Sequence, residues 1–227
     1  MKNLSEQIQP SLQRATAVFV FFILCQSAFA HVVVQELEKM SGSDAAGVYL
    51  KLGYTHILPL GLDHILFVLS LFLLSPKLKP LLWQATAFTI AHSVTLGLAM
   101  YQIITPPAGI VEPLIALSIL YVSLENIISP RLKASRIGVV FLFGLIHGMG
   151  FAGALGQLGL PQNAYLLSLV MFNIGVELGQ MTIILLAYFL LAKWFGNKPW
   201  YRKRIVIPIS AGIAVTACIW TIQRFLV

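Results

Sequence analysis

Six long apolar runs follow one another along this chain of 227 residues. They span residues 53–74, 81–104, 109–128, 137–158, 164–191 and 205–227. Each is close to the ~20 residues that a helix needs to cross the hydrocarbon core of a bilayer. Hydrophobic residues make up 58% of the chain and charged residues only 10%, which excludes an ordinary soluble domain. The sequence therefore predicts an all-α membrane protein, a six-transmembrane-helix bundle in a lipid bilayer.

The first thirty residues have the layout of a secretory signal peptide. Lys2 and Arg14 precede a short apolar core at residues 15–24, and Ala28-Phe29-Ala30 places small residues at both recognition positions of a cleavage site. We therefore expect residues 1–30 to be a cleavable signal peptide. A retained first helix is the alternative, because the apolar stretch can be extended to about the minimum length of a span.

Cleavage would leave two regions in the mature chain. Residues 31–52 form the one sizeable polar segment, which we expect on the outer, periplasmic side. Within it, Asp44 could cap a short amphipathic helix running toward Leu52. Residues 53–227 carry the six runs and form the predicted transmembrane domain.

The distribution of basic residues predicts the orientation. The formal net charge of +7 could suggest a nucleic-acid partner, but almost no charge lies inside the apolar runs. Ten Lys and Arg residues lie in the connections at 75–80, 131–136 and 193–204, and none lies in the alternate connections at 105–108 and 159–163. Basic loops stay in the cytoplasm. We therefore expect a multi-pass protein of the bacterial inner membrane with both mature termini on the outer side and no nucleic-acid partner.

Weak similarity between two parts of the chain suggests an internal repeat. The sequence Gly61–His64 resembles Gly144–His147, and Val94–Gly97 resembles Val176–Gly179, with offsets of 83 and 82 residues. Three runs separate the copies, so the two halves would have opposite orientations, as in transporters built from 3+3 inverted repeats. Chance similarity in an apolar chain is the alternative.

Ionisable side chains are unusually frequent inside the predicted spans. Each costs about 2.5 kcal/mol or more at the centre of a bilayer, so each is a candidate for function. The candidate metal ligands are His56, Asp63, His64, His92, His147 and Glu177. Polar residues that could support them are Ser93, Glu125, Asn126, Asn173 and Gln180.

The first run carries three of these candidates. His56 and Asp63 lie on one stripe of a regular helix but two turns apart, so they could not share a metal ion there. Pro59 and Gly61 lie between them, and a break at that point would bring His56 close to Asp63 and His64. The alternative is a proline kink with His56 at the membrane interface.

The fifth run has a face of polar side chains, and the fourth run has a face of small residues. Asn173, Glu177 and Gln180 follow i, i+4, i+7 spacing and share one helix face. Amides can join neighbouring helices, whereas the carboxylate of Glu177 needs a cation or a proton. In the fourth run, small residues at every fourth position indicate a close helix crossing beside His147.

The donor atoms suit a divalent transition metal. Neutral imidazoles with carboxylate and amide oxygens fit Ni, Co, Zn, Mn or Fe(II). The two cysteines, Cys25 and Cys218, lie in the first and last apolar stretches, which argues against a thiolate cluster and a disulfide. Met149, Met171 and Met181 leave copper as an alternative.

These residues also form motifs that resemble a known family. The stretch His56–His64 and the stretch Phe143–Gly148 resemble the two histidine motifs of the HupE/UreJ membrane proteins. Further similar stretches are Thr86–Thr95, Glu112–Ser118, Glu125–Asn126 and Phe172–Gln180, which resemble the branch with a signal peptide and six spans. The resemblance implies a nickel permease or accessory. After His147 the motif continues Gly-Met-Gly-Phe, without the acidic residue of hydrogenase-associated members.

We therefore predict a permease or facilitator whose substrate is a divalent metal ion. An intramembrane metal-dependent enzyme and a metal-sensing accessory protein are the alternatives. Against an enzyme, the chain lacks the H-E-x-x-H and G-x-S-x-G signatures.

Overall fold

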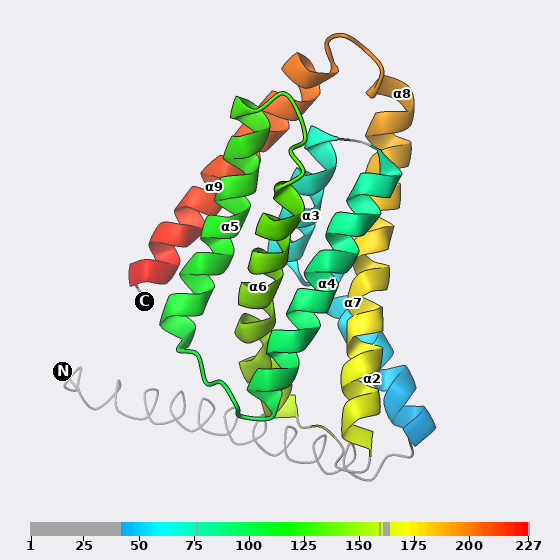
Figure 1. Ribbon diagram of the computed structural model, residues 1–227, viewed down its shortest axis with the longest axis vertical. Coiled ribbons are helices and arrows are strands. Elements are labelled where there is room, and N and C mark those ends of the chain that lie inside the picture. Colours follow the sequence, from blue (N-terminus) through cyan, green and yellow to red (C-terminus); the bar gives the residue numbers. More distant parts are fainter. Residues whose placement is uncertain (1–41, 76, 159, 161–163, 227) are drawn as a thin grey trace, which may run out of the picture.

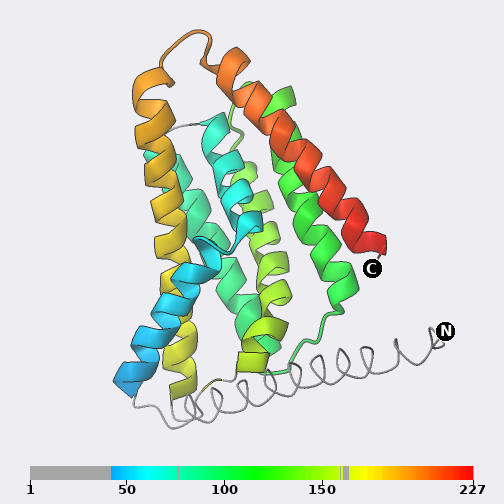
Figure 2. The same cartoon turned by 180° about the vertical axis from the view of Figure 1, so that it is seen from behind.

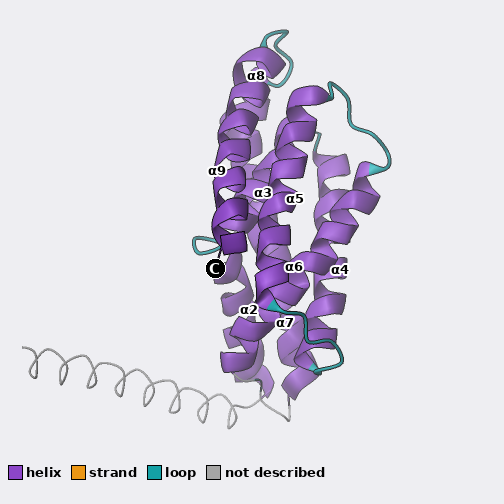
Figure 3. Cartoon of the chain, turned by 90° about the vertical axis from the view of Figure 1, so that its left-hand side faces the viewer, coloured by secondary structure: helices purple, strands orange, loops and turns teal. Residues whose placement is uncertain are grey.

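The computed structural model describes residues 42–75, 77–158, 160 and 164–226. The predicted signal peptide lies outside this part of the chain. Every regular element in the described residues is helical (Figure 3). The elements are α2 (Gly42–Ile57), α3 (Leu62–Leu74), α4 (Leu78–Met100), α5 (Ala108–Ile128), α6 (Arg136–Leu158), α7 (Tyr165–Ala187), α8 (Lys193–Phe195) and α9 (Ile207–Leu226), with π-helical segments η2 (Tyr188–Ala192) and η3 (Arg202–Val206). The expectation of an all-α protein is confirmed.

Four helical segments of the described chain are long and apolar enough to cross a membrane. They are Ala108–Ile128, Arg136–Gly153, Tyr165–Phe195 and Arg202–Leu226. The pair α2 and α3, bent by 67°, is a fifth candidate. Helix α4 has 23 residues, as do α6 and α7, but its polar side chains lower its hydropathy. The chain is thus a multi-pass membrane protein with four or five candidate spans, and the count of six stays a prediction.

The helices form one bundle (Figures 1 and 2). Three pairs make the most extensive contacts, namely α4 with α6, α2 with α7, and α5 with α9. The connections after α3, α5 and α8 lie at one end of the bundle, whereas α4 ends and α5 begins at the other (Figure 1). The connections rich in basic residues therefore share one end, which we call the basic end.

Large apolar side chains fill the interior, and others cover the outside of the bundle. Tyr49, Phe67, Phe72, Phe88 and Phe172 are among the largest fully buried side chains. Exposed apolar side chains include Ile90, Leu142, Leu186, Leu190 and Phe225. Such an exterior suits lipid, because lipid tails are as apolar as these side chains.

The first apolar run does not form one regular helix. Helix α2 ends at Ile57 and α3 begins at Leu62, on either side of a cis Leu58–Pro59 peptide bond. A Cβ on Gly61 would lie 2.2 Å from the carbonyl oxygen of His56, so this close return of the chain requires glycine. Residues 53–57, at the start of this apolar run, are the last residues of α2, which begins at Gly42. Of the two alternatives for the segment around Pro59 and Gly61, the structure has a break between two helices.

Candidate metal centre

Four histidines from four helices meet inside the bundle. His56 lies in the last turn of α2, His64 in the first turn of α3, His92 in α4 and His147 in α6. The ring centroid of His64 lies 4.7 Å from that of His56, 5.2 Å from that of His147 and 6.1 Å from that of His92. His64, His92 and His147 are 6%, 0% and 1% exposed. The break after Ile57 makes this cluster possible, because it returns His56 to the beginning of α3.

Each of these imidazoles keeps one nitrogen without a partner. The Nε2 atoms of His56, His64, His92 and His147 are buried, and no hydrogen-bond partner accompanies any of them among the described residues. Buried polar atoms are normally hydrogen-bonded. Four such atoms in one cluster indicate a site for a ligand.

Hydrogen bonds at the opposite nitrogens fix the tautomers of two of the rings. Nδ1 of His147 lies 2.8 Å from the carbonyl oxygen of Phe143 and donates to it. Asn173 donates through Nδ2 to the carbonyl of Leu169 at 2.8 Å, which leaves its Oδ1 to accept from Nδ1 of His92 at 3.2 Å. Both Nε2 atoms then carry lone pairs. Proteins hold imidazoles as metal ligands in this way, with the second nitrogen bonded to an oxygen.

Three of the histidines lie close enough to share a metal ion. Ligand nitrogens of His56, His64 and His92 lie within 4.8 Å of one another. Around a four-coordinate ion with bonds of ~2.0–2.1 Å, such nitrogens would be about 3.3 Å apart, so small side-chain rotations would close the site. An all-imidazole set suits Zn, Ni, Fe or Cu better than Mn, which prefers oxygen ligands. His147 borders the same space as a further nitrogen donor.

Aromatic rings and a close helix crossing hold the histidines in place. The ring of Phe151 lies 3.8 Å from that of His56, centroid to centroid, and the ring of Phe88 lies 5.0 Å from that of His147. Helix α6 meets α4 at Gly148, where a Cβ would lie 2.2 Å from the carbonyl oxygen of His92. Of the small residues of the fourth run, Gly144 and Gly148 therefore lie at the close crossing with α4, which brings His147 toward His92, whereas a Cβ on Gly156 would meet no atom within 4 Å.

A cavity of about 760 Å³ leads from the cluster to the surface. It is lined by His56, His64 and His147 and also by the exposed side chain of Leu60. Its charged lining residues are Asp63, Glu112 and Arg224. The start of α5 and the end of α9, which carry Glu112 and Arg224, lie away from the basic end (Figure 2). The cavity therefore approaches the histidines from the opposite end.

Asp63 lines this cavity, but its carboxylate is paired with Arg224. Nη2 of Arg224 lies 2.9 Å from Oδ2 and 3.1 Å from Oδ1 of Asp63. Nη1 of Arg224 donates to the carbonyl of Glu112 at 3.3 Å, and the guanidinium lies 5.4 Å from the ring of Trp220. The structure thus places Asp63 beside the histidine cluster in an ion pair.

The polar residues of the fifth run share the face of α7 that looks toward α4, as their spacing predicts. Only Asn173 contacts a histidine. The carboxylate of Glu177 accepts hydrogen bonds from Thr86, at 2.9 Å, and from Thr89. Oε1 of Gln180 lies 3.4 Å from Oγ1 of Thr89. Ser93, next to His92, donates to the carbonyl of Thr89 at 2.6 Å.

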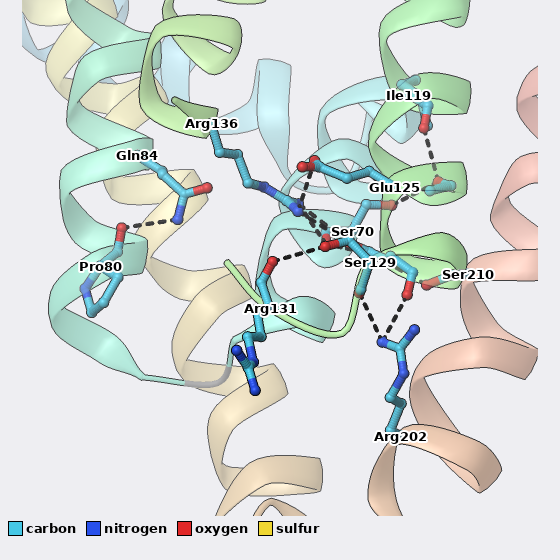
Figure 4. A network of polar contacts seen from close by, with 12 residues as sticks. Ser70, Pro80, Gln84, Ile119, Glu125, Ser129, Arg131, Arg136, Arg202 and Ser210 are labelled. Carbon is cyan, nitrogen blue, oxygen red and sulfur yellow. Dashed lines mark hydrogen bonds and ion pairs between the residues drawn. The ribbon is translucent and has the colours of Figure 1, made fainter. Parts of the chain in front are cut away.

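Glu125 and Asn126 belong to a separate polar network, at the end of α5 from which the basic connection 131–136 follows. Figure 4 shows Glu125 and Arg136 of this network side by side. Nη1 of Arg136 lies 3.1 Å from Oε2 of Glu125 and donates to Oδ1 of Asn126 at 3.2 Å. Asn126 donates to the carbonyl of Ser70 at 2.8 Å, and Arg202 donates to the carbonyl of Asn126 at 3.0 Å. These contacts join α3, α5, α6 and η3.

Two arginines that form ion pairs with candidate carboxylates, Arg136 and Arg224, are not among the residues that the sequence singles out. Arg224 had a clear signal, because it is the one charged residue in the run 205–227. Arg136 belongs by sequence to the basic connection 131–136, although its side chain is buried at the start of α6. A charge at the end of an apolar run can therefore point inward as well as toward water.

A family model described as HupE / UreJ protein matches residues 29–224 of the chain. The match includes all four histidines of the cluster. Searches of curated proteins and of solved structures found no match.

Proposed function

The chain belongs to the HupE/UreJ family, and we propose that it is a membrane permease or facilitator for a divalent transition-metal ion of the nickel type. This family is associated with nickel uptake, and the chain is a helical membrane protein with a buried histidine triad that could bind metal. The observation that carries the proposal is the set of four buried Nε2 atoms without hydrogen-bond partners in the described structure. We propose His56, His64, His92 and His147 as ligands of the ion in transit.

The chemistry of the cluster favours exchange of the ion over permanent storage. A transport site must replace the hydration shell of an ion and yet release it. Neutral imidazoles supply nitrogen lone pairs without negative charge, so they bind a divalent ion less strongly than a site that also contains carboxylates. The cavity lining has two carboxyl side chains, Asp63 and Glu112, against one cationic side chain, Arg224, and this excess of acidic residues would attract the cation toward the cluster. We assign Asn173 the role of orienting His92.

The two ends of the bundle support a path that is open at one end only. The cavity approaches the histidines from the end opposite to the basic end. Toward the basic end, the buried contacts of Arg136 with Glu125 and Asn126 tie the helices together. We propose that this network closes the path in the described conformation and loosens when the ion leaves.

The helix contacts support a 3+3 inverted repeat. If α2 and α3 correspond to α6, α4 to α7, and α5 to α9, a two-fold axis exchanges the α2–α7 contact with the α4–α6 contact and maps the α5–α9 contact onto itself. These are the three pairs with the most extensive contacts. His64 and His147 would be equivalent positions, and their ring centroids lie 5.2 Å apart. We propose six spans on this basis, with α2 and α3 as one broken span and α4 as the least apolar.

Metal uptake into vesicles tests this function. The full chain is reconstituted with a metal-sensitive dye inside, and Ni, Co, Zn, Mn, Fe(II) and Cu are added outside. We expect uptake of at least one ion and its loss in His64→Ala and His92→Ala. Gln84→Ala is a matched control, because Gln84 is a buried polar residue of α4 that donates to the carbonyl of Pro80. Tight metal binding without uptake of any ion would contradict transport and favour a sensor or an enzyme.

A further inference from the structure

Glu177 lies in a polar site of its own between α4 and α7. Oγ1 of Thr86 lies 2.9 Å from Oε1 of the carboxyl group, and Oγ1 of Thr89 contacts Oε2. The two ion pairs of the described residues, Arg136 with Glu125 and Arg224 with Asp63, do not include Glu177. Its partners are hydroxyl groups, whereas the proposed metal ligands are imidazoles.

This site opens into a groove on the outside of the bundle. The groove has a volume of about 520 Å³, and Glu177, Thr86 and Thr89 are among its lining residues. Its other walls include side chains of α4 and α7 that are both apolar and exposed, namely Ile90, Val94, Leu166, Val170 and Ile174. Because α7 is a candidate span, these walls face lipid. An ionised carboxylate without a cation is costly in such surroundings, so a carboxyl group here needs polar partners within the groove.

The hydroxyl groups can satisfy both protonation states of the carboxyl group. When Glu177 is ionised, Thr86 donates to Oε1 and Thr89 donates to Oε2. When Oε2 carries a proton, it can donate to Oγ1 of Thr89, and the Thr89 hydroxyl turns to the carbonyl of Ala85, which lies 3.1 Å away. A hydroxyl has one hydrogen and two lone pairs and rotates freely, so this change needs no movement of heavy atoms.

The ligands favour a proton over a metal ion at this position. Thr86 donates a hydrogen bond to the carboxylate of Glu177. A metal ion would require both hydroxyl oxygens to turn their lone pairs inward, and Thr86 would then lose its acceptor. A proton on Oε2 leaves each hydrogen with an acceptor.

Other titratable groups on neighbouring elements are directed elsewhere or lie at the surface. Those on the elements that pack against α7 are Asp44, Tyr49, Lys51, Tyr54 and His56 of α2, Asp63 and His64 of α3, Lys79 and His92 of α4, and Tyr188 of η2. Tyr54 donates to Thr182 at 3.4 Å, and His92 donates to Asn173 at 3.2 Å. The side chains of Asp44, Lys51 and Lys79 are exposed.

We propose that Glu177, Thr86 and Thr89 form a proton-binding site that opens to the α4–α7 groove and is separate from the histidine cluster. The site exchanges its proton without the cluster having to bind a metal ion. It therefore does not depend on the proposed transport function, and its test needs no metal.

Modification with dicyclohexylcarbodiimide tests the site. This apolar reagent takes the proton of a carboxylic acid on nitrogen while the carboxylate oxygen adds to its central carbon, and rearrangement gives a stable N-acylurea. The full-length protein in detergent is treated over a pH series and digested, and the modified peptides are identified by mass spectrometry. We expect an adduct at Glu177 whose rate falls by up to about tenfold per pH unit once the acid is the minority form. A water-soluble carbodiimide should leave Glu177 unmodified, because the walls of the groove are apolar.

Three variants test whether the adduct forms on Glu177 and whether the two threonine hydroxyl groups affect its pH profile. Glu177→Gln should remove the adduct. Thr86→Val and Thr89→Val each remove a hydroxyl that binds the ionised form more strongly than the neutral form, so the pH of half-maximal rate should rise by about one unit. The proposal would be overturned if Glu177 were modified only after unfolding in sodium dodecyl sulfate. Modification at the same rate at every pH, or an unshifted profile in both valine variants, would overturn it as well.

Discussion

Nδ1 of His92 on α4 lies 3.2 Å from Oδ1 of Asn173 on α7. The amide of Asn173 is itself held by the carbonyl of Leu169, so it presents oxygen to the histidine and not its NH2 group. Glu177 lies one turn further along α7 on the same face. One helix interface thus carries both a candidate metal ligand and the carboxyl group proposed to bind a proton.

The first prediction concerns this hydrogen bond. Asn173→Ala should weaken metal binding by about 10–100-fold, because His92 loses the acceptor that fixes its tautomer and ring orientation. Affinity is measured by competition with a chromophoric chelator. Gln180→Ala is the control, since Gln180 lies on the same face of α7 and contacts Thr89. Equal affinity in the two variants would show that Asn173 has no role at the metal site.

The second prediction is a stoichiometry of about one divalent metal ion per chain in the purified protein, since one cluster of imidazoles offers lone pairs. His64→Ala should lower it, because His64 is the central ring, with centroids of the other three within 6.1 Å. Metal content is measured after gel filtration in detergent. Unchanged metal content in a folded His64→Ala protein would remove the cluster as the binding site.

The third prediction separates Asp63 from the histidines. Asp63→Asn should keep metal bound at the cluster but lower uptake, because the cavity loses a carboxylate that attracts the cation. The broken ion pair with Arg224 is partly exposed, so the free energy of unfolding should fall by only about 1 kcal/mol. A double-mutant cycle with Arg224→Gln measures the coupling. Loss of bound metal in Asp63→Asn, with the fold intact, would instead make Asp63 a ligand.

The sequence alone predicts the helices and the histidines better than it predicts the partners of the carboxylates. The predicted runs 109–128 and 137–158 differ from α5 and α6 by one residue at their starts. The run 53–74 is broken, because the close return of the chain at Gly61 cannot be read from hydropathy. Pro59 and Gly61 nevertheless give a local signal for the break and hence for the approach of His56 to His64.

The partners of the carboxylates are set by long-range packing. Arg224 lies 161 residues from Asp63, and Thr86 lies 91 residues from Glu177. Helical spacing predicts correctly that Asn173, Glu177 and Gln180 share a face. It does not predict that α4 would present a histidine to Asn173 but hydroxyl groups to Glu177. The candidates therefore divide among a histidine cluster, an ion pair at the cavity and a hydroxyl-lined site.

The fourth prediction concerns orientation. Cysteines introduced at Ser135 and Asn197 should be protected from an impermeant thiol reagent in intact cells, and one at Asn163 should react, because the basic connections are expected in the cytoplasm. The native Cys25 and Cys218 must first be replaced, since Cys218 is a free and exposed thiol. The opposite labelling pattern would reverse the predicted orientation.

The fifth prediction concerns the effect of the proton-binding site at Glu177 on metal transport through the histidine cluster. Glu177→Gln keeps the shape of the side chain and can still accept from Thr86, but it cannot exchange a proton. In vesicles, we expect a folded variant with strongly reduced metal uptake that responds less to an imposed pH gradient than the parent protein does. Gln84→Ala, which changes a buried amide of α4 that does not belong to the Glu177 site, should keep the response of the parent.

The alternative role of Glu177 gives a different result in the same assay. If its only role were to join α4 to α7 by hydrogen bonds, Gln would replace it with little change in uptake, in pH dependence or in thermal stability. Loss of uptake with a lower melting temperature would point to damaged packing. Loss of uptake at an unchanged melting temperature, together with a flatter pH profile, requires a proton at Glu177 during transport. Unchanged flux with an unchanged pH profile would remove Glu177 from the transport cycle and leave it, at most, a proton-binding site.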